Sequence, residues 1–353
     1  MPMYLNIPIE KLCVSPETHL RTVVKTIQLA EKQIVIVVDE QRQLLGLITD
    51  GDVRRAILHN IPMDSPASEI MQRKFIAGHE GMGLFEICEL MQLKSVRHIP
   101  IVDADGILQD LVWISDLDLH PRLSMSAVVM AGGFGHRLRP LTKDLPKPML
   151  PVGDKPLLEI TIQQLKEAGI HRVHVSTHYQ SDKIINHFGS GEHLGVEISY
   201  LKEDQPLGTA GILSQLNGSE EPIFVINGDI LTRIDFQSML AFHNDHNADL
   251  TVAVRQYDVE VPYGVLECSG PHVDKISEKP TYRFFVNAGI YILQPASYHH
   301  IPEDQPFDMT DLIEALISAQ RVVVSYPITE YWLDIGQHAD YQKAQDDIKN
   351  GKY

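Results

Sequence analysis

The first feature with evident chemistry is a glycine-rich segment that directly follows a short apolar strand at residues 127–130. Gly132, Gly133 and Gly135 stand close together at this point. Glycines at the end of a strand let the backbone approach a phosphate and point several N–H groups at it. A dinucleotide fingerprint is excluded because Leu138 stands in place of the third glycine, and a P-loop is excluded because no Gly-Lys-Ser/Thr follows.

Two cations can complete such a phosphate site. Arg137 follows the glycines, and Lys147 lies between Pro146 and Pro148, which hold it in a nearly fixed position. The backbone amides and the two cations together would bind a polyphosphate. Asp229, which follows the apolar strand 223–226, is a candidate metal ligand, because Mg²⁺ prefers carboxylate oxygens.

Alternating strands and helices must position these residues. The predicted strands are 127–130, 173–176, 223–226, 250–254 and 285–293. The predicted helices are one from Pro156 to Gly169 and others near 181–187, 209–216, 236–245 and 309–319. This alternation is typical of an α/β sheet with helices on its faces, in which ligands bind beyond the carboxyl ends of the strands. The glycine-rich segment and Asp229 both follow such ends.

An internal repeat occupies the first third of the chain. A shift of 64 residues places Leu20 on Leu84 and Asp39 on Asp103 without a gap. Each copy is predicted to contain a helix, a strand, an Asp-containing turn and a second strand, and the two copies should pack as a pseudo-symmetric pair. We therefore expect a repeat pair at 1–120 (copies at about 1–60 and 65–120), a linker at 121–126 and a second domain at 127–353.

Composition excludes several classes of protein. The 353 residues carry a formal net charge of −17, which opposes binding to a nucleic-acid backbone. The aliphatic run at 34–38 is far too short to span a membrane, so no membrane partner is expected. The first residues lack the features of a secretory signal, which predicts a cytoplasmic protein. Three scattered cysteines indicate neither a disulfide framework nor a zinc site.

The repeat pair resembles the cystathionine-beta-synthase-type (CBS) repeat, which often binds adenine nucleotides. The matching segments are 37–39 with 46–53, and 100–103 with 112–117. The resemblance implies that Asp52 and Asp116 bind ribose hydroxyls and that Thr49 donates to a phosphate of AMP, ADP or ATP. Trp113 stands where the first copy has Thr49, which argues against a second nucleotide site. A pair that only packs and dimerises is the alternative.

The second domain, over about 126–348, resembles the sugar-1-phosphate nucleotidyltransferases. The motifs that carry the resemblance are Gly-Gly-x-Gly-x-Arg-Leu-x-Pro-Leu-Thr at 132–142, Pro-Lys-Pro at 146–148, Glu-Asp-Gln-Pro-Leu-Gly-Thr-Ala-Gly at 203–211, Asn-Gly-Asp at 227–229, Tyr-Gly at 263–264, Glu-Lys-Pro at 278–280, Asn-Ala-Gly-Ile-Tyr at 287–291 and Trp-Leu-Asp-Ile-Gly at 332–336. The resemblance implies a Rossmann-like α/β domain with a mixed, mostly parallel sheet. His136 departs from the pattern, since the family usually has a small hydroxyl residue there, and it is assigned no role.

The resemblance also implies roles for individual residues. Arg137 and Lys147 would be catalytic, and Asp229 and Asp334 would hold Mg²⁺. The implied nucleotide-binding residues are Ala131, Gly132, Gly133, Gly135, Gly208 and Thr209. The implied sugar-phosphate-binding residues are Gly264, Glu278, Lys279 and Asn287.

The expected reaction is attack by a sugar-1-phosphate on the α-phosphorus of a nucleoside triphosphate, with release of pyrophosphate. Among the family, the motifs look most like mannose-1-phosphate guanylyltransferases, and the fusion to CBS repeats resembles guanylyltransferases that form GDP-amino sugars. GTP with mannose-1-phosphate or glucosamine-1-phosphate is therefore favoured. A uridylyl- or thymidylyltransferase of the same fold and a catalytically silent nucleotide sensor are the alternatives. We expect a homo-oligomer.

Overall fold

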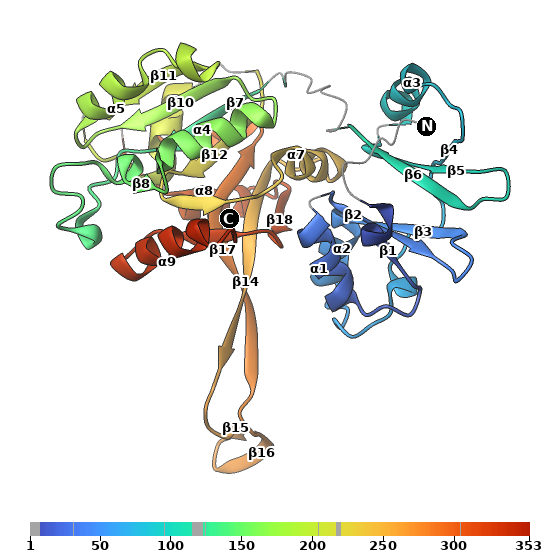
Figure 1. Ribbon diagram of the computed structural model, residues 1–353. Coiled ribbons are helices and arrows are strands. Elements are labelled where there is room, and N and C mark those ends of the chain that lie inside the picture. The colour runs from blue at the N-terminus through green and yellow to red at the C-terminus, as the bar shows by residue number, and fades with distance from the viewer. Residues whose placement is uncertain are drawn as a thin grey trace. The chain divides into compact units, whose positions relative to one another are not determined.

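The computed structural model describes residues 8–30, 32–94, 96–114, 123, 125–203, 205–216, 220–303 and 305–353. The chain forms two compact units, Met1–Pro121 and Arg122–Tyr353 (Figure 1). Half of the predicted linker 121–126, residues 121, 122 and 124, lies outside the described residues. Within the described residues, no helix is both long enough and apolar enough to cross a membrane.

The first unit contains two sheets of identical topology. One consists of β1 (Cys13–Val14), β2 (Ile34–Val38) and β3 (Leu44–Thr49), and the other of β4 (Gly78–His79), β5 (His98–Val102) and β6 (Leu108–Trp113). In each sheet the first strand runs parallel to the second, and the second pairs antiparallel with the third. The helices are α1 (Leu20–Ala30), α2 (Asp50–Leu58) and α3 (Leu84–Lys94). The bounds of α1, β2 and β3 recur 64 residues later in α3, β5 and β6, which confirms the predicted repeat.

The turn between the last two strands is built in the same way in both copies. The Asp39 carboxylate accepts hydrogen bonds from the backbone N–H groups of residues 41 and 43, at 2.9 and 2.8 Å. Asp103 accepts the equivalent bonds from residues 105 and 107, at 3.0 and 2.9 Å. An Asp side chain that replaces a backbone partner favours such a turn. The shared Asp positions in the sequence thus mark a shared piece of structure.

The second unit is built on a seven-stranded sheet in the order β11-β10-β7-β12-β17-β14-β18. The strands are β7 (Ser126–Met130), β10 (Arg172–Thr177), β11 (Glu197–Lys202), β12 (Ile223–Asn227), β14 (Leu250–Glu260), β17 (Thr281–Leu293) and β18 (Val323–Pro327). The strands β7, β10, β11 and β12 are parallel, β17 is antiparallel to its neighbours β12 and β14, and β18 is parallel to β14. The predicted α/β class with a mixed, mostly parallel sheet is confirmed.

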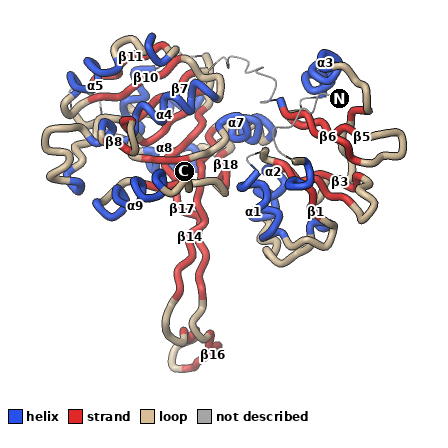
Figure 2. Tube along the Cα trace, in the orientation of Figure 1, coloured by secondary structure: helices blue, strands red, loops and turns tan. Residues whose placement is uncertain are grey.

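Helices cover both faces of this sheet, as Figure 2 shows. The helices of this unit are α4 (Leu157–Glu167), α5 (Ser181–Phe188), α6 (Gly208–Gly211), α7 (Phe236–Asp245), α8 (Met309–Ser318) and α9 (His338–Lys349). Because successive strand residues face opposite sides, Val225 joins the core cluster containing Leu312 of α8. Its neighbour Phe224 meets Phe236 of α7 on the other side, with ring centroids 5.3 Å apart. The predicted helix at 209–216 is instead one α-helical turn, α6, followed by a 3₁₀ segment, Ile212–Leu216.

Two strands extend far beyond the sheet. The predicted strands 250–254 and 285–293 are only the inner parts of β14 and β17, which remain paired as far as Glu260 and Thr281. The connection between them forms a second hairpin of β15 (Val265–Ser269) and β16 (His272–Ser277). We call residues 255–286 the arm; Figure 1 shows β15 and β16 at its outer end.

Candidate active site

The carboxyl ends of β7 and β12 bring the glycine-rich segment and Asp229 to one edge of the sheet. These strands are parallel neighbours, and Asn227 pairs with Met130 in the last register position. The Gly228 N–H then donates to the Met130 carbonyl at 2.9 Å. A Cβ on Gly228 would lie 2.5 Å from that carbonyl oxygen, so only glycine permits this approach. Asp229 is therefore held beside the start of the glycine-rich segment.

A pair of short strands brings Asp334 to Asp229. In the antiparallel pair of β13 (Ile230–Thr232) and β19 (Trp332–Asp334), Ile230 lies opposite Asp334. The Ile335 N–H also donates to the Asp229 carbonyl at 3.0 Å. The two aspartates are 105 residues apart in the sequence and adjacent in the structure.

The two predicted cations, Lys147 and Arg137, both interact electrostatically with the acidic pair. Lys147 Nζ donates to Asp229 Oδ2 at 2.6 Å. Burial raises the pKa of the Asp334 carboxyl, and the negative charges of Asp229 and then Asp340 raise it further, while Lys147 and Arg137 lower it. The structure thus brings together the two predicted catalytic residues and the two predicted metal ligands. Asp340, at the start of α9, is an acidic neighbour that the motifs did not indicate.

The glycine-rich segment packs closely against the lysine-bearing segment. Gly135 has a positive φ of 63°. A Cβ at Gly135 would lie 3.0 Å from Thr142 Cγ2 and 3.2 Å from Lys147 Cβ. Gly132 similarly lies against the Glu203 carboxylate, which would be 2.8 Å from an added Cβ, whereas an added Cβ at Gly133 meets no atom within 4 Å. Gly133 therefore borders the open space that a phosphate needs.

Two of the predicted nucleotide-binding residues have internal roles. The Thr209 N–H and hydroxyl both donate to Asp308 Oδ1, at 2.9 and 3.1 Å, and the hydroxyl oxygen accepts from the Met309 N–H at 2.9 Å. These bonds tie α6 to the N-terminus of α8. Ala131 is buried, and its N–H donates to the Ser176 carbonyl at 3.1 Å. Both residues position the backbone of the site.

Two polar residues of the quoted motifs had been assigned no role. Glu203 accepts a hydrogen bond from the Leu207 N–H at 3.0 Å and lines the glycine-rich segment. Asn227, immediately before Gly228 and Asp229, has a buried Oδ1 with no hydrogen-bond partner among the described residues. A buried, unpartnered oxygen at the mouth of a site is available to a ligand. Its place in the Asn-Gly-Asp motif was the signal that could have identified it.

The structure places three of the four predicted sugar-phosphate residues on the arm and the fourth at its base. Gly264, Glu278 and Lys279 lie on the arm, and Glu278 Oε2 would be 3.0 Å from a Cβ on Gly264. Asn287 lies at the base of the arm, where its Oδ1 accepts a hydrogen bond from the Gly289 N–H at 3.0 Å.

In the first unit, the predicted ribose ligand Asp52 is already engaged. Asp52 Oδ2 accepts from the Thr49 N–H and hydroxyl at 2.8 and 2.6 Å, which forms a capping box at the start of α2. Asp52 Oδ1 accepts from Arg55 and Gln72 at 2.5 and 2.8 Å. A ribose would have to displace some of these donors. The second predicted ligand, Asp116, lies outside the described residues.

The acidic pair fits a magnesium ion. Among the residues that the structure describes, no group of three or more His, Cys, Asp or Glu side chains could hold a metal. Mg²⁺, however, commonly uses one or two carboxylates and completes its octahedron with waters and substrate phosphates. The repulsion between Asp229 and Asp334 that raises the pKa of Asp334 is relieved by a divalent cation.

In comparisons with known proteins, the two units match different family models. Residues 126–351 match the family model for nucleotidyl transferases, and residues 6–59 and 67–112 each match the model for the CBS domain. The chain is 36% identical over 227 residues to mannose-1-phosphate guanylyltransferase 1 of Arabidopsis thaliana, covering 62% of this chain and 63% of the relative. It is 33% identical over 228 residues to the catalytic subunit beta of that enzyme in Danio rerio, covering 62% of each chain. The chain thus spans less than two thirds of the length of these relatives.

Among solved structures, the chain is similar to HddC from Yersinia pseudotuberculosis. The TM-score is 0.50 at 29% identity, over 63% of this chain and 99% of HddC. A second structure of HddC, in complex with GMP-PN, has a TM-score of 0.50 at 28% identity and the same coverage.

Proposed function

This chain belongs to the nucleotidyl transferase family, and from that premise we propose that it transfers a nucleotidyl group from a nucleoside triphosphate to a sugar-1-phosphate and releases pyrophosphate. The observation that supports this proposal best is the convergence of Arg137, Lys147, Asp229 and Asp334 beside a glycine-rich segment. Two cations, two acidic metal ligands and exposed backbone amides are the parts that phosphoryl transfer needs.

The reaction needs positioning and charge stabilisation, because the phosphate oxygen of the sugar substrate arrives ionised and needs no general base. The backbone at Gly133, together with Arg137, holds the phosphates of the triphosphate. Lys147, which donates to Asp229, stabilises with its ammonium the negative charge that develops during transfer. Asp229 and Asp334 would hold Mg²⁺, which would supply further positive charge at the phosphates.

For the nucleotide and the sugar, we propose GTP with mannose-1-phosphate or glucosamine-1-phosphate. The relatives in Arabidopsis and Danio are named mannose-1-phosphate guanylyltransferases, and HddC was solved with a guanine nucleotide analogue. A uridylyl- or thymidylyltransferase is the alternative within the same fold. We further propose that an adenine nucleotide regulates the enzyme through the CBS unit, near Thr49 and Asp52.

A panel of substrates tests the proposal. Purified protein is incubated with Mg²⁺, with GTP, UTP, dTTP or CTP, and with either sugar-1-phosphate, and released pyrophosphate is measured. We expect the highest rate with GTP and no rate in an Asp229→Asn variant. Pyrophosphate release with another triphosphate alone would favour the alternative base, and release with none of them would favour the catalytically silent sensor.

A further inference from the structure

Beyond the pair of Gln256 and Phe285, the β14–β17 ribbon of the arm has one apolar and one polar face. Residues directly opposite each other on antiparallel strands point to the same face, so the register of β14 and β17 assigns each pair. The apolar face consists of Tyr257 opposite Phe284 and Val259 opposite Tyr282. On the polar face between them, Arg283 Nε donates to Asp258 Oδ1 at 3.0 Å.

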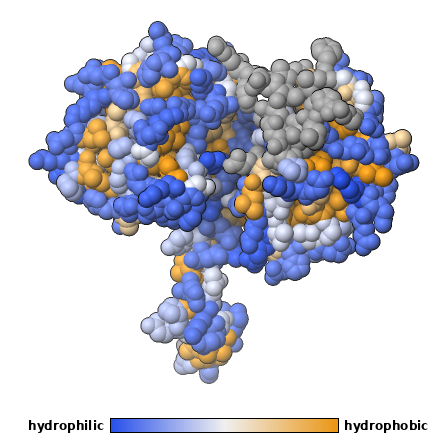
Figure 3. Space-filling model, in the orientation of Figure 1, coloured by the Kyte–Doolittle hydropathy of each residue, from blue (hydrophilic) through white to orange (hydrophobic). Residues whose placement is uncertain are grey.

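The outer hairpin of the arm also exposes apolar side chains. Leu266 lies opposite Ile276, and Val273 lies opposite Cys268. In Figure 3 hydrophobic residues are visible on this outer end. We define the arm surface as seven of the exposed apolar side chains of the arm: Tyr257, Val259, Leu266, Val273, Ile276, Tyr282 and Phe284.

The arm surface has the size of a protein interface. Its side chains are between 39% (Val259) and 67% (Ile276) exposed. If a fully exposed aromatic side chain offers about 150–250 Å² and an aliphatic one somewhat less, these seven expose about 700 Å². One partner in a standard interface contributes about 800 Å². A ribbon of two strands has no further strand or helix of its own that could pack over such a face, so the face stays exposed.

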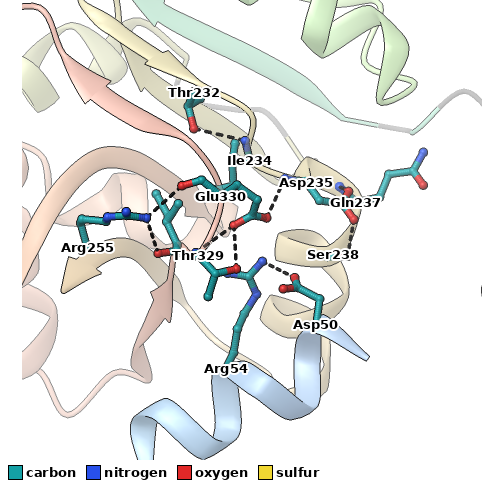
Figure 4. Close-up of polar contacts among 11 residues, drawn as sticks. Asp50, Arg54, Thr232, Ile234, Asp235, Gln237, Ser238, Arg255, Thr329 and Glu330 are labelled. Carbon is teal, nitrogen blue, oxygen red and sulfur yellow. Dashed lines mark hydrogen bonds and ion pairs between the residues drawn. The ribbon is translucent and has the colours of Figure 1, made fainter. Parts of the chain in front are cut away.

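The base of the arm is fixed to the sheet. Arg255 Nη1 donates to the carbonyls of Ile328 and Glu330, at 3.0 and 2.9 Å (Figure 4). Trp332 Nε1 donates to the Ala288 carbonyl at 2.9 Å. The arm is thus a preformed element with a defined direction, and docking it costs less conformational entropy than ordering a loose loop.

The residues on the arm identify its partner, given the function proposed above. Glu278 and Lys279 were assigned to the sugar phosphate, but they lie between β16 and the outer end of β17, in the part of the arm that Figure 1 shows projecting away from the sheet. The cluster of this copy therefore lacks the set that the arm carries. A second copy of the chain has both a cluster that lacks this set and an arm that bears it.

We propose that the arm of one copy docks on a second copy and supplies Glu278 and Lys279 to its active site. The arm surface forms the contact, and Lys279 provides the cation that binds the sugar phosphate. In a two-fold dimer the exchange is reciprocal, so each copy completes the site of the other.

Complementation between two inactive variants tests this exchange. Lys147→Ala removes a cation from the cluster, and Lys279→Ala removes one from the arm, so each variant alone is expected to lose turnover. In a co-expressed equal mixture, half of the dimers are mixed and each mixed dimer has one intact site, so about one quarter of wild-type activity returns. A mixture that is as inactive as its components overturns the proposal, because the arm then acts within its own chain.

A measurement of mass separates this proposal from the proposed function. The double variant Tyr257→Ser/Phe284→Ser should shift the monomer–dimer equilibrium toward monomer in analytical ultracentrifugation, whereas the polar-face control Glu260→Gln should not. An unchanged equilibrium in the double variant overturns arm docking. If wild-type protein turns over no triphosphate, the proposed function fails, and the ultracentrifugation result still decides whether the arm docks on a second copy.

Discussion

Replacing Lys147 by Met tests the role of the cation that links the glycine-rich segment to the acidic pair. Methionine keeps most of the aliphatic stem and removes the charge. The lysine side chain is 12% exposed and lies 2.6 Å from Asp229 Oδ2. At an effective dielectric constant near 20, two unit charges about 4 Å apart interact by about 4 kcal/mol, and the partial exposure of Asp229 reduces the effect on folding well below this figure.

The expected loss is larger in catalysis than in stability. Losing one preorganised group that stabilises transition-state charge typically costs about 10²–10³ in kcat. We expect a decrease of this order in the rate of pyrophosphate release, with a loss of folding stability of about 1 kcal/mol. Initial rates at saturating substrate and urea unfolding followed by circular dichroism measure the two quantities.

Lys143→Met is the matched control. Lys143 belongs to the same proline-rich segment, and its side chain is exposed to solvent. The control should keep wild-type kcat. A second readout follows from the ion pair: without Lys147, Asp229 Oδ2 is available to a cation, so Mn²⁺ should bind the nucleotide-free variant more tightly than wild type in calorimetry. A Lys147→Met variant that keeps both wild-type kcat and wild-type Mn²⁺ affinity would refute the assigned role.

Three further predictions concern other parts of the chain. Burial and Asp229 raise the pKa of Asp334, so as the pH is lowered the Mn²⁺ affinity should begin to fall at a higher pH than it would with an ordinary carboxyl ligand. Asp334→Asn should remove this part of the pH profile. A pH profile of the variant that is identical to wild type would contradict this prediction. Burial lowers the pKa of His243 from 6.5 to about 4, so the stability that its neutral form provides is complete above pH 6.5 and is lost as the pH falls toward 4. Wild type should lose up to about 3 kcal/mol over this window, and His243→Gln should lose less in urea unfolding at pH 7 and 4.5. At the CBS unit, AMP, ADP or ATP should change turnover through a coupling of about 1–3 kcal/mol, and Asp52→Ala should abolish the heat of binding; an active wild-type protein that shows no heat would leave the unit as a dimerisation module.

The parts of the fold that a local pattern specifies were predictable from the sequence. The 64-residue repeat appears in the sequence because each copy must place its apolar residues and its turn aspartate at the same positions. The strands that lead to Gly132 and Asp229 were predictable because buried parallel strands are continuous apolar runs. The adjacency of Asp229 and Asp334 was not, since it depends on the pairing of two three-residue strands, β13 and β19, that are distant in the sequence.

The arm and the capping box show a second limit of prediction from the sequence. The alternation of Tyr257 and Val259 with polar residues indicates a strand with one apolar face, but such a pattern does not say whether that face is covered. Likewise, Thr49 and Asp52 have the spacing both of a helix cap and of a nucleotide site. The structure shows the cap, with Asp52 accepting bonds on both oxygens. In both cases the sequence specified the residues, and their partners depend on tertiary structure.

The charge balance of the site also differs from the simplest interpretation of the sequence. Arg137 and Lys147 suggest a positively charged phosphate site, but the structure places carboxylates there too: Asp334 interacts electrostatically with Asp229 and Asp340 as well as with the two cations. The charges that act on Asp334 are thus of both signs, two cations and two further carboxylates. Two polyanionic substrates would repel each other there by several kcal/mol. Under the proposed function and the proposed exchange of arms, a divalent cation at the carboxylates and Lys279 from the arm would supply the positive charge that brings the two substrates together.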